Sequence, residues 1–393
     1  MSTTGRTAQS DADALAARLR EAPFVRVLAA ADGDSVAASG VVARALDCPF
    51  QVSVTRTVAE RERRAARVAD DHPDEAALTL VVGDDAEGTA VPGVDRPATV
   101  TAVDVARGLG ASPDPVLSLA GAFAAGAVPG AGESASVLAA AEERGLVERR
   151  PGVAVPTADL ADGLAHSTLV HAEFSGDSTA ADAALADLDL PAELDGDARR
   201  AVASLVALSA TGGEGVTPRA AESVERTLRP YATPDAPFAT VGGYADVLDA
   251  VAEDAPGTAV ALALGHDARD AALTAWRDAS ERAHRALREA TTGRYDGLFV
   301  ARDDGEPVAT TARLLRDFRS PESVALVVGD GEAAAAATDD RGIGPAMRAG
   351  AAAVDGEAGG DAHTGYARFD PDGDDGATSP ETREFIAAFR EAL

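Results

Sequence analysis

Apolar and polar positions along the chain alternate between short apolar runs and longer stretches with helical spacing. The short runs, of the length of single strands, lie at 24–29, 50–55 and 77–82. Helical spacing follows at 10–20, 36–46, 58–69 and 118–128. Residues 98–103 fit either a further strand or the start of a helix. Strands that alternate with helices predict a mostly parallel sheet with helices on both faces, and therefore an α/β domain.

The pattern changes after residue 133. A helix at 134–146 and a hairpin at 146–157 suggest a small winged-helix-like unit, and 158–265 is mainly helical. A helical pattern without Gly or Pro runs from 267 to 291, followed by strands at 297–301, 323–328 and 364–369 and a final helix at 379–393. We therefore expect an N-terminal α/β domain (1–133), a helical insertion (134–265), a linking helix (266–292) and a smaller C-terminal α/β domain (293–393).

The net charge of the chain says more about the salt concentration around the protein than about its binding partners. The formal net charge is −30, with 65 acidic residues against 35 basic ones, all of them Arg. Acidic residues spread along the whole chain are typical of extreme halophiles. At molar salt the Debye length is about 3 Å, so this charge neither supports nor excludes nucleic-acid binding. The one cysteine, Cys48, excludes an intrachain disulfide and a Cys-rich zinc site.

No apolar run reaches the ~18 residues of a membrane span, and no secretory signal is present. We therefore expect a cytoplasmic protein without a membrane partner.

Two carboxylates, Asp32 and Asp34, lie in the turn that joins the first strand to its helix. The carboxyl end of a strand in an open α/β sheet is a common ligand site, and paired carboxylates suit hard divalent cations. Asp is also a leading N-cap residue. The spacing therefore leaves two interpretations open, a metal site and a helix cap.

The order of elements and three segments resemble the DHH phosphoesterase superfamily, in particular the archaeal RecJ-like nucleases. The segments are ADGDSVAASGVVARAL (31–46), DLADGLAHSTLVHAEFSGD (159–177) and GEAGGDAHTGYARFD (356–370). The resemblance in order spans nearly the whole chain. It implies a DHH-type parallel-sheet domain, a helical insertion, a long linking helix and a DHH-associated C-terminal domain.

The resemblance also implies a metal centre, since that family holds two Mn ions that clamp a phosphodiester. The carboxylates that it places at the metals, whether Mn or Mg, are Asp32, Asp34, Asp84 and Asp104. Other positions depart from the family pattern, because its His and Asp ligands fall on Ala30, Val105, Ala106 and Ala125. The substrate-contacting Gly-rich motif corresponds to Gly359 and Gly360, with His363 beside it.

These departures favour a catalytically degenerate RecJ-like protein that acts on or near single-stranded DNA in replication or repair. The resemblance then points to the inactive branch of the family, which supplies a subunit of eukaryotic replicative helicases. The implied partners are GINS- or MCM-type replication proteins or a RecJ paralogue. The alternative is an active Mn- or Mg-dependent single-strand-specific exonuclease or phosphodiesterase.

The other histidines have unremarkable settings in the sequence. We expect His72 in a charged loop, His166 and His171 on helix surfaces or between domains, and His284 on a solvated face of the long helix. Trp276 is expected to pack along the same helix.

Overall fold

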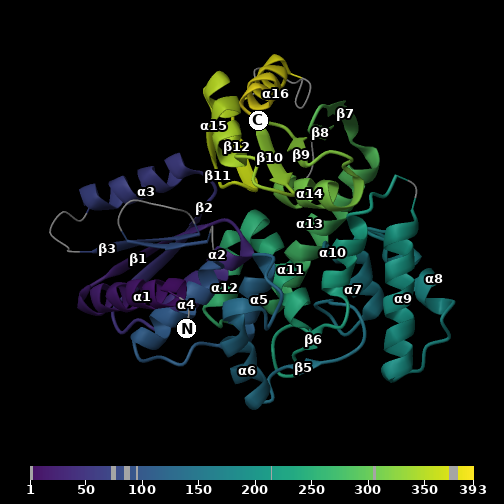
Figure 1. Ribbon diagram of the computed structural model, residues 1–393, viewed down its shortest axis with the longest axis horizontal. Coiled ribbons are helices and arrows are strands. Elements are labelled where there is room, and N and C mark those ends of the chain that lie inside the picture. The colour runs from purple at the N-terminus through teal and green to yellow at the C-terminus, as the bar shows by residue number, and fades with distance from the viewer. Residues whose placement is uncertain are drawn as a thin grey trace. The chain divides into compact units, whose positions relative to one another are not determined.

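The computed structural model describes residues 3–71, 77–83, 89–93, 96–213, 215–303, 307–370 and 379–393 (Figure 1). The chain divides into two compact units that interleave along the sequence. Unit 1 consists of Met1–Thr55, Glu60–Glu148 and Tyr231–Ala275, and unit 2 of Arg56–Ala59, Arg149–Pro230 and Trp276–Leu393. The expected division into four consecutive segments stays a prediction.

Unit 1 contains a parallel sheet, as the sequence predicts. Its strands are β1 (Val25–Ala30), β2 (Phe50–Thr55), β3 (Leu78–Gly83) and β4 (Ala90–Pro92). Their order is β2-β1-β3-β4, and each neighbouring pair is parallel. The central strand β1 is almost completely buried, which explains why its sequence is a continuous apolar run.

The helices of unit 1 pack on this sheet and on one another. They are α1 (Thr3–Glu21), α2 (Gly33–Ala43), α3 (Val58–Asp71), α4 (Ala98–Gly108), α5 (Pro115–Ala124), η1 (Gly132–Ser134), α6 (Ala135–Glu143), α11 (Val241–Asp254) and α12 (Pro256–Ala263). Every residue of α2 is buried, and it packs against α4, α5 and α11. Residues 98–103, which fitted either element, are helical.

The first part of unit 2 is helical, apart from two-residue strands at its boundaries. Its helices are α7 (Leu160–His166), α8 (Ser178–Ala186), α9 (Gly196–Gly212) and α10 (Ala220–Thr227), and the short strands are β5 (Glu148–Arg149), which begins in unit 1, and β6 (Tyr231–Ala232), which belongs to unit 1. The four helices share a core around Phe174 and Phe318. The hairpin expected at 146–157 is wrong, because Val153 bridges to Leu228 and the segment pairs with a distant part of the chain.

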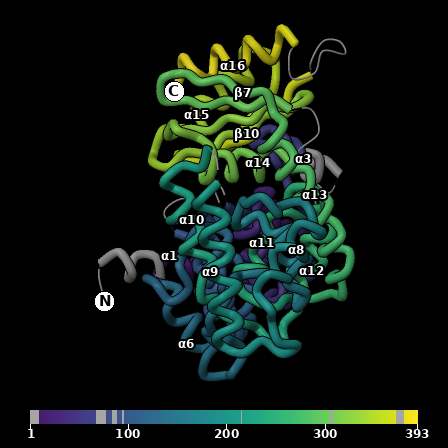
Figure 2. The backbone as a smooth tube through the Cα atoms, turned by 90° about the vertical axis from the view of Figure 1, so that its right-hand side faces the viewer, coloured from purple at the N-terminus to yellow at the C-terminus, as the bar shows by residue number. Residues whose placement is uncertain are grey.

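The long helix α13 (Arg269–Glu289) leads from unit 1 into the second part of unit 2. There a six-stranded sheet has the order β11-β12-β10-β9-β8-β7, antiparallel except for β8 and β9. Its elements are β7 (Thr291–Tyr295), β8 (Leu298–Arg302), α14 (Val308–Leu314), η2 (Leu315–Arg319), β9 (Val324–Val328), β10 (Glu332–Ala337), α15 (Ile343–Ala353), β11 (Glu357–Gly360), β12 (Thr364–Arg368) and α16 (Pro380–Ala392). Helices α15 and α16 lie side by side (Figure 2).

Among the described residues, none of the helices combines the length and the apolar character that a bilayer crossing requires.

Candidate functional site

The turn after β1 is held by its own carboxylates. Asp32 has an extended backbone and is the N-cap of α2. One of its carboxylate oxygens accepts a hydrogen bond from the Ser35 amide and the other from the Ser35 hydroxyl, each at 2.7 Å. The amide of Gly33 donates to Oδ1 of Asp249 on α11 at 2.9 Å. The capping interpretation of Asp32 is therefore confirmed.

Asp34 joins two helices. Its side chain is only 6% exposed and accepts hydrogen bonds from the amides of Ala98 (2.6 Å) and Thr99 (2.9 Å) and from the Thr99 hydroxyl. These amides begin α4, whose own N-cap residue is Pro97 and supplies no capping side chain. The Asp34 side chain, on α2, therefore accepts hydrogen bonds from the N–H groups at the start of α4, which have no acceptor within that helix.

Burial raises the pKa of Asp34 to about 7, with the nearby Asp32 carboxylate acting in the same direction. The hydrogen bonds from Thr99 and Ala98 oppose the shift. The group is thus an internal acid with a structural role, and its oxygens already have three donors.

A glycine of the neighbouring strand allows this turn to lie close against the sheet. Gly83, at the end of β3, has a φ of +98°, and a Cβ atom there would overlap the Ser35 hydroxyl. Only glycine combines this φ with so close an approach. The Ser35 side chain therefore lies directly against the end of β3.

Of the two other expected carboxylates, Asp104 has a described position and is paired with arginines. Asp104, on α4, pairs with Arg96 at 2.6 Å and with Arg107 at 3.6 Å. Asp84 and His72 lie outside the described residues. Over the part of the chain that the structure describes, no three His, Cys, Asp or Glu side chains are placed to hold a metal ion.

The positions that depart from the family pattern offer no ligand either. Ala30 ends β1, Ala125 is the C-cap of α5, and Val105 and Ala106 are buried in α4. The described donor set does not fit a pair of Mn or Mg ions, which requires several carboxylates and imidazoles around each metal.

The glycine-rich turn lies in unit 2. Gly359 and Gly360 end β11, and a side chain on Gly344 of α15 would overlap the Gly360 carbonyl. These glycines therefore allow a helix and a strand to approach closely. His363 is exposed, and its amide donates to Oδ1 of Asp361 at 2.7 Å. The structure brings these three predicted residues into one turn.

Three histidines form a buried group. His166, His171 and His284 are each no more than 5% exposed. The solvated face expected for His284 and the helix-surface alternative for His166 and His171 are therefore wrong. Nδ1 of His171 lies 3.0 Å from Nδ1 of His284, so one ring donates and the other accepts. Burial lowers the pKa of His171 to about 3 and that of His284 well below its usual range, so both are neutral.

His166 lies at the edge of this group. Its Nε2 is 3.1 Å from Oε1 of Glu281, and its ring makes an edge contact with Trp276. Trp276 is fully buried on α13, which confirms its predicted packing. The helical spacing of Trp276, Ser280 and His284 was the signal available in the sequence, since all three lie on the buried face of α13.

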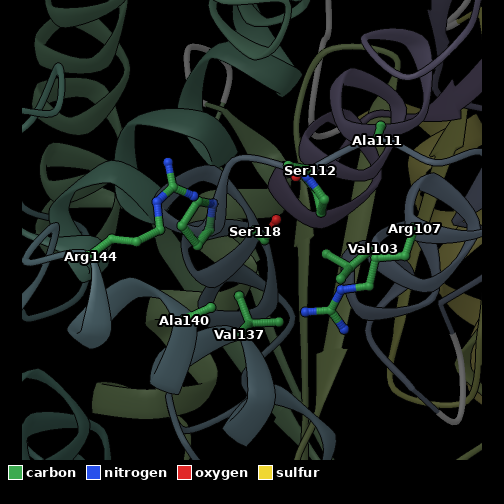
Figure 3. Close-up of a pocket in the computed structure, with 10 residues that line it drawn as sticks. Val103, Arg107, Ala111, Ser112, Ser118, Val137, Ala140 and Arg144 are labelled. Atoms are coloured by element: carbon green, nitrogen blue, oxygen red, sulfur yellow. The ribbon is translucent and has the colours of Figure 1, made fainter.

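A cavity of about 240 Å³ lies between α4, α5 and α6 of unit 1 (Figure 3). Arg107 and Arg144 enter from opposite sides, with the Ser118 hydroxyl between them. The described residues that line it include neither Asp32 nor Asp34 and no carboxylate or imidazole.

Comparison with solved structures defines the class of fold. CDC45 from Entamoeba histolytica is 6% identical and matches with a TM-score of 0.58 over 97% of this chain and 99% of that chain. The fold is therefore similar to that of CDC45. RecJ in complex with Mn²⁺ from Thermus thermophilus is 14% identical, with a TM-score of 0.49 over 97% of this chain and 55% of that chain. A similarity of that degree does not define a shared fold.

Comparison of sequences defines the family. The uncharacterized protein rrnAC1427 of Haloarcula marismortui is 50% identical over 401 residues, which cover 100% of both chains. The family model "Uncharacterized protein rrnAC1427, C-terminal domain" matches residues 290–391. The chain belongs to the rrnAC1427 family.

Proposed function

We propose that this chain is a non-catalytic RecJ-like protein of DHH type, which acts by binding partners in DNA replication or repair. The observation that carries the proposal is the position of Asp34. Its carboxyl group is buried and bonded to the start of α4, where a phosphodiesterase of this type needs a free metal ligand. The turn that contains Asp32 and Asp34 therefore links α2 to α4 through hydrogen bonds of Asp34.

The substituted ligand positions support the same proposal. Alanine and valine side chains cannot coordinate a cation, so Ala30, Ala125, Val105 and Ala106 remove the groups that would complete the centre. The similarity to CDC45 supports the fold part of the proposal. The partner classes come from the sequence resemblance: GINS- or MCM-type replication proteins or a RecJ paralogue, with single-stranded DNA at the turn that contains Gly359, Gly360 and His363.

Metal binding tests the loss of the catalytic centre. Isothermal titration of the full chain with MnCl₂ in molar KCl is expected to show no saturable site in the micromolar range, in the wild type or in the Asp32→Ala variant. A micromolar site that disappears in Asp32→Ala would contradict the proposal and favour the active exonuclease.

Co-purification tests the partner. Tagged protein expressed in a halophilic archaeon and purified at molar KCl is expected to retain a replication or repair protein, identified by mass spectrometry, that the tag alone does not retain. Recovery of no such protein would count against a role in these complexes.

A further inference from the structure

A second cavity, of about 360 Å³, lies at one edge of the C-terminal sheet. Tyr295 of β7, Arg302 of β8 and one face of α16 line it. The residues of α16 are Arg383, Ile386, Ala387 and Arg390. All six lie within the region 290–391 that the family model matches.

The cavity concentrates positive charge in a strongly acidic chain. Among the lining residues that the structure describes, half are arginines and none is acidic. None of the ion pairs formed by the described residues involves Arg302, Arg383 or Arg390. Other arginines of the same unit do have carboxylate partners, such as Arg294 with Glu322 and Arg316 with Asp317. Because the chain holds 65 acidic residues for 35 arginines, three arginines around one cavity that pair with no carboxylate in the described ranges indicate an anionic ligand.

The lining also offers flat and apolar surface beside the charges. The guanidinium of Arg390 lies over the ring of Tyr295, 4.9 Å from its centroid, which holds both side chains in place. Ile386 is 4% exposed and forms an apolar wall. The ligand therefore has an anionic group for the arginines and a flat, weakly polar part for the ring and the apolar wall.

We infer that this cavity binds the phosphate and the base of one nucleotide unit. Guanidinium groups recognise phosphate oxygens in pairs, and bases stack on aromatic and guanidinium planes. A volume of about 360 Å³ lies in the range of small-ligand sites. The side chain of an acidic peptide supplies the anion but lacks the flat ring.

The cavity is separate from the glycine-rich turn. Gly359 and Gly360 lie on β11 at one edge of the sheet, whereas Tyr295 lies on β7 at the opposite edge. The phosphate belongs either to a free nucleotide or to a single strand, and the strand as its source rests on the proposed function.

Binding of a 5′-fluorescein-labelled oligothymidylate to the full chain tests the inference, measured by anisotropy between 0.5 and 2 M KCl with EDTA present. Arg383→Gln is expected to weaken binding about tenfold, because a charge-assisted bond is lost. It should also make the slope of log affinity against log salt shallower by about 0.7, as one lost phosphate contact requires. Arg348→Gln is the control, because Arg348 is an exposed arginine on α15 outside the cavity and the charge change is the same.

Competition distinguishes the source of the ligand. Displacement of the oligonucleotide by AMP indicates a site that accepts a free nucleotide, and displacement by unlabelled strand alone indicates a strand site. Either result supports the inference when Arg383→Gln, and not Arg348→Gln, weakens binding. Equal affinity of the two variants, no binding at all, or equal displacement by a poly-glutamate peptide would overturn it. None of these failures affects the proposed loss of catalysis, which is tested by metal binding and hydrolysis.

Discussion

Replacing Asp34 by alanine is expected to destabilise unit 1 strongly. The change leaves the amides of Ala98 and Thr99 buried without their acceptor, which costs about 1–2 kcal/mol for each amide. The Thr99 hydroxyl keeps the main-chain carbonyl of Asp34 as an acceptor, at 2.9 Å. The free energy of unfolding should therefore fall by about 3 kcal/mol. A carboxylate kept only for metal binding predicts no loss, or a gain.

Asp32→Ala is the matched control. Asp32 is exposed and caps α2, and the loss of this cap should reduce the free energy of unfolding by about 1 kcal/mol. Urea unfolding in 2 M KCl, followed by circular dichroism at pH 7, measures both values. Equal stability of Asp34→Ala and the wild type, or a smaller loss than in Asp32→Ala, would refute the reasoning.

The pH dependence gives a second measurement on the same residue. A pKa raised from 3.8 to about 7 means that the folded state binds the proton more tightly than the unfolded state. The resulting stabilisation is fully present below pH 3.8 and is lost as the pH rises through 7, by up to about 4 kcal/mol. Compared with Asp34→Asn, the wild type should therefore lose stability between pH 4 and pH 7. Parallel pH profiles of the two proteins would contradict the raised pKa.

Three further predictions follow from individual contacts. The lowered pKa of His171 means that its contribution to stability is lost as the pH falls below 6.5. In His171→Asn, stability should therefore fall less steeply at acid pH, as measured by unfolding followed through the fluorescence of the single tryptophan. An unchanged dependence on acid pH would count against the buried pair. Gly83→Ala should lower the free energy of unfolding by about 3 kcal/mol, because the positive φ and the steric overlap both oppose a side chain there. Gly110→Ala should lower it by about 1 kcal/mol, since Gly110 has a φ of +90° but open space around it. Equal melting temperatures of the two variants would disprove the close approach at Gly83. Asp162→Asn breaks the paired bonds to Arg277, at 2.7 and 2.9 Å, and should cost about 1–2 kcal/mol in urea unfolding, while no change would show that the pair is too solvated to contribute.

Local patterns were enough to predict most of the fold. A continuous apolar run of strand length identifies β1, which is buried on both faces. Buried positions that repeat with the helical period identify α13. Strand β10 escaped prediction because its run of alanines has little intrinsic strand preference. It is a strand because it is paired between β9 and β12 and buried there.

The role of Asp34 could not be predicted from its neighbourhood in the sequence. Its partners Ala98 and Thr99 are more than 60 residues away, so the spacing of the two aspartates left capping and metal binding equally open. The burial of His284 beside His171 depends on contacts across 113 residues for the same reason. Both the role of Asp34 and the burial of His284 therefore depend on tertiary packing, which local sequence patterns do not show.

The most direct test of the central claim is hydrolysis of labelled single-stranded DNA by the full chain in molar KCl with MnCl₂. We expect no release of nucleotides above that of an Asp32→Ala control, because the acidic turn joins helices and its described surroundings do not supply a metal centre. Robust turnover that disappears in Asp32→Ala would contradict the account.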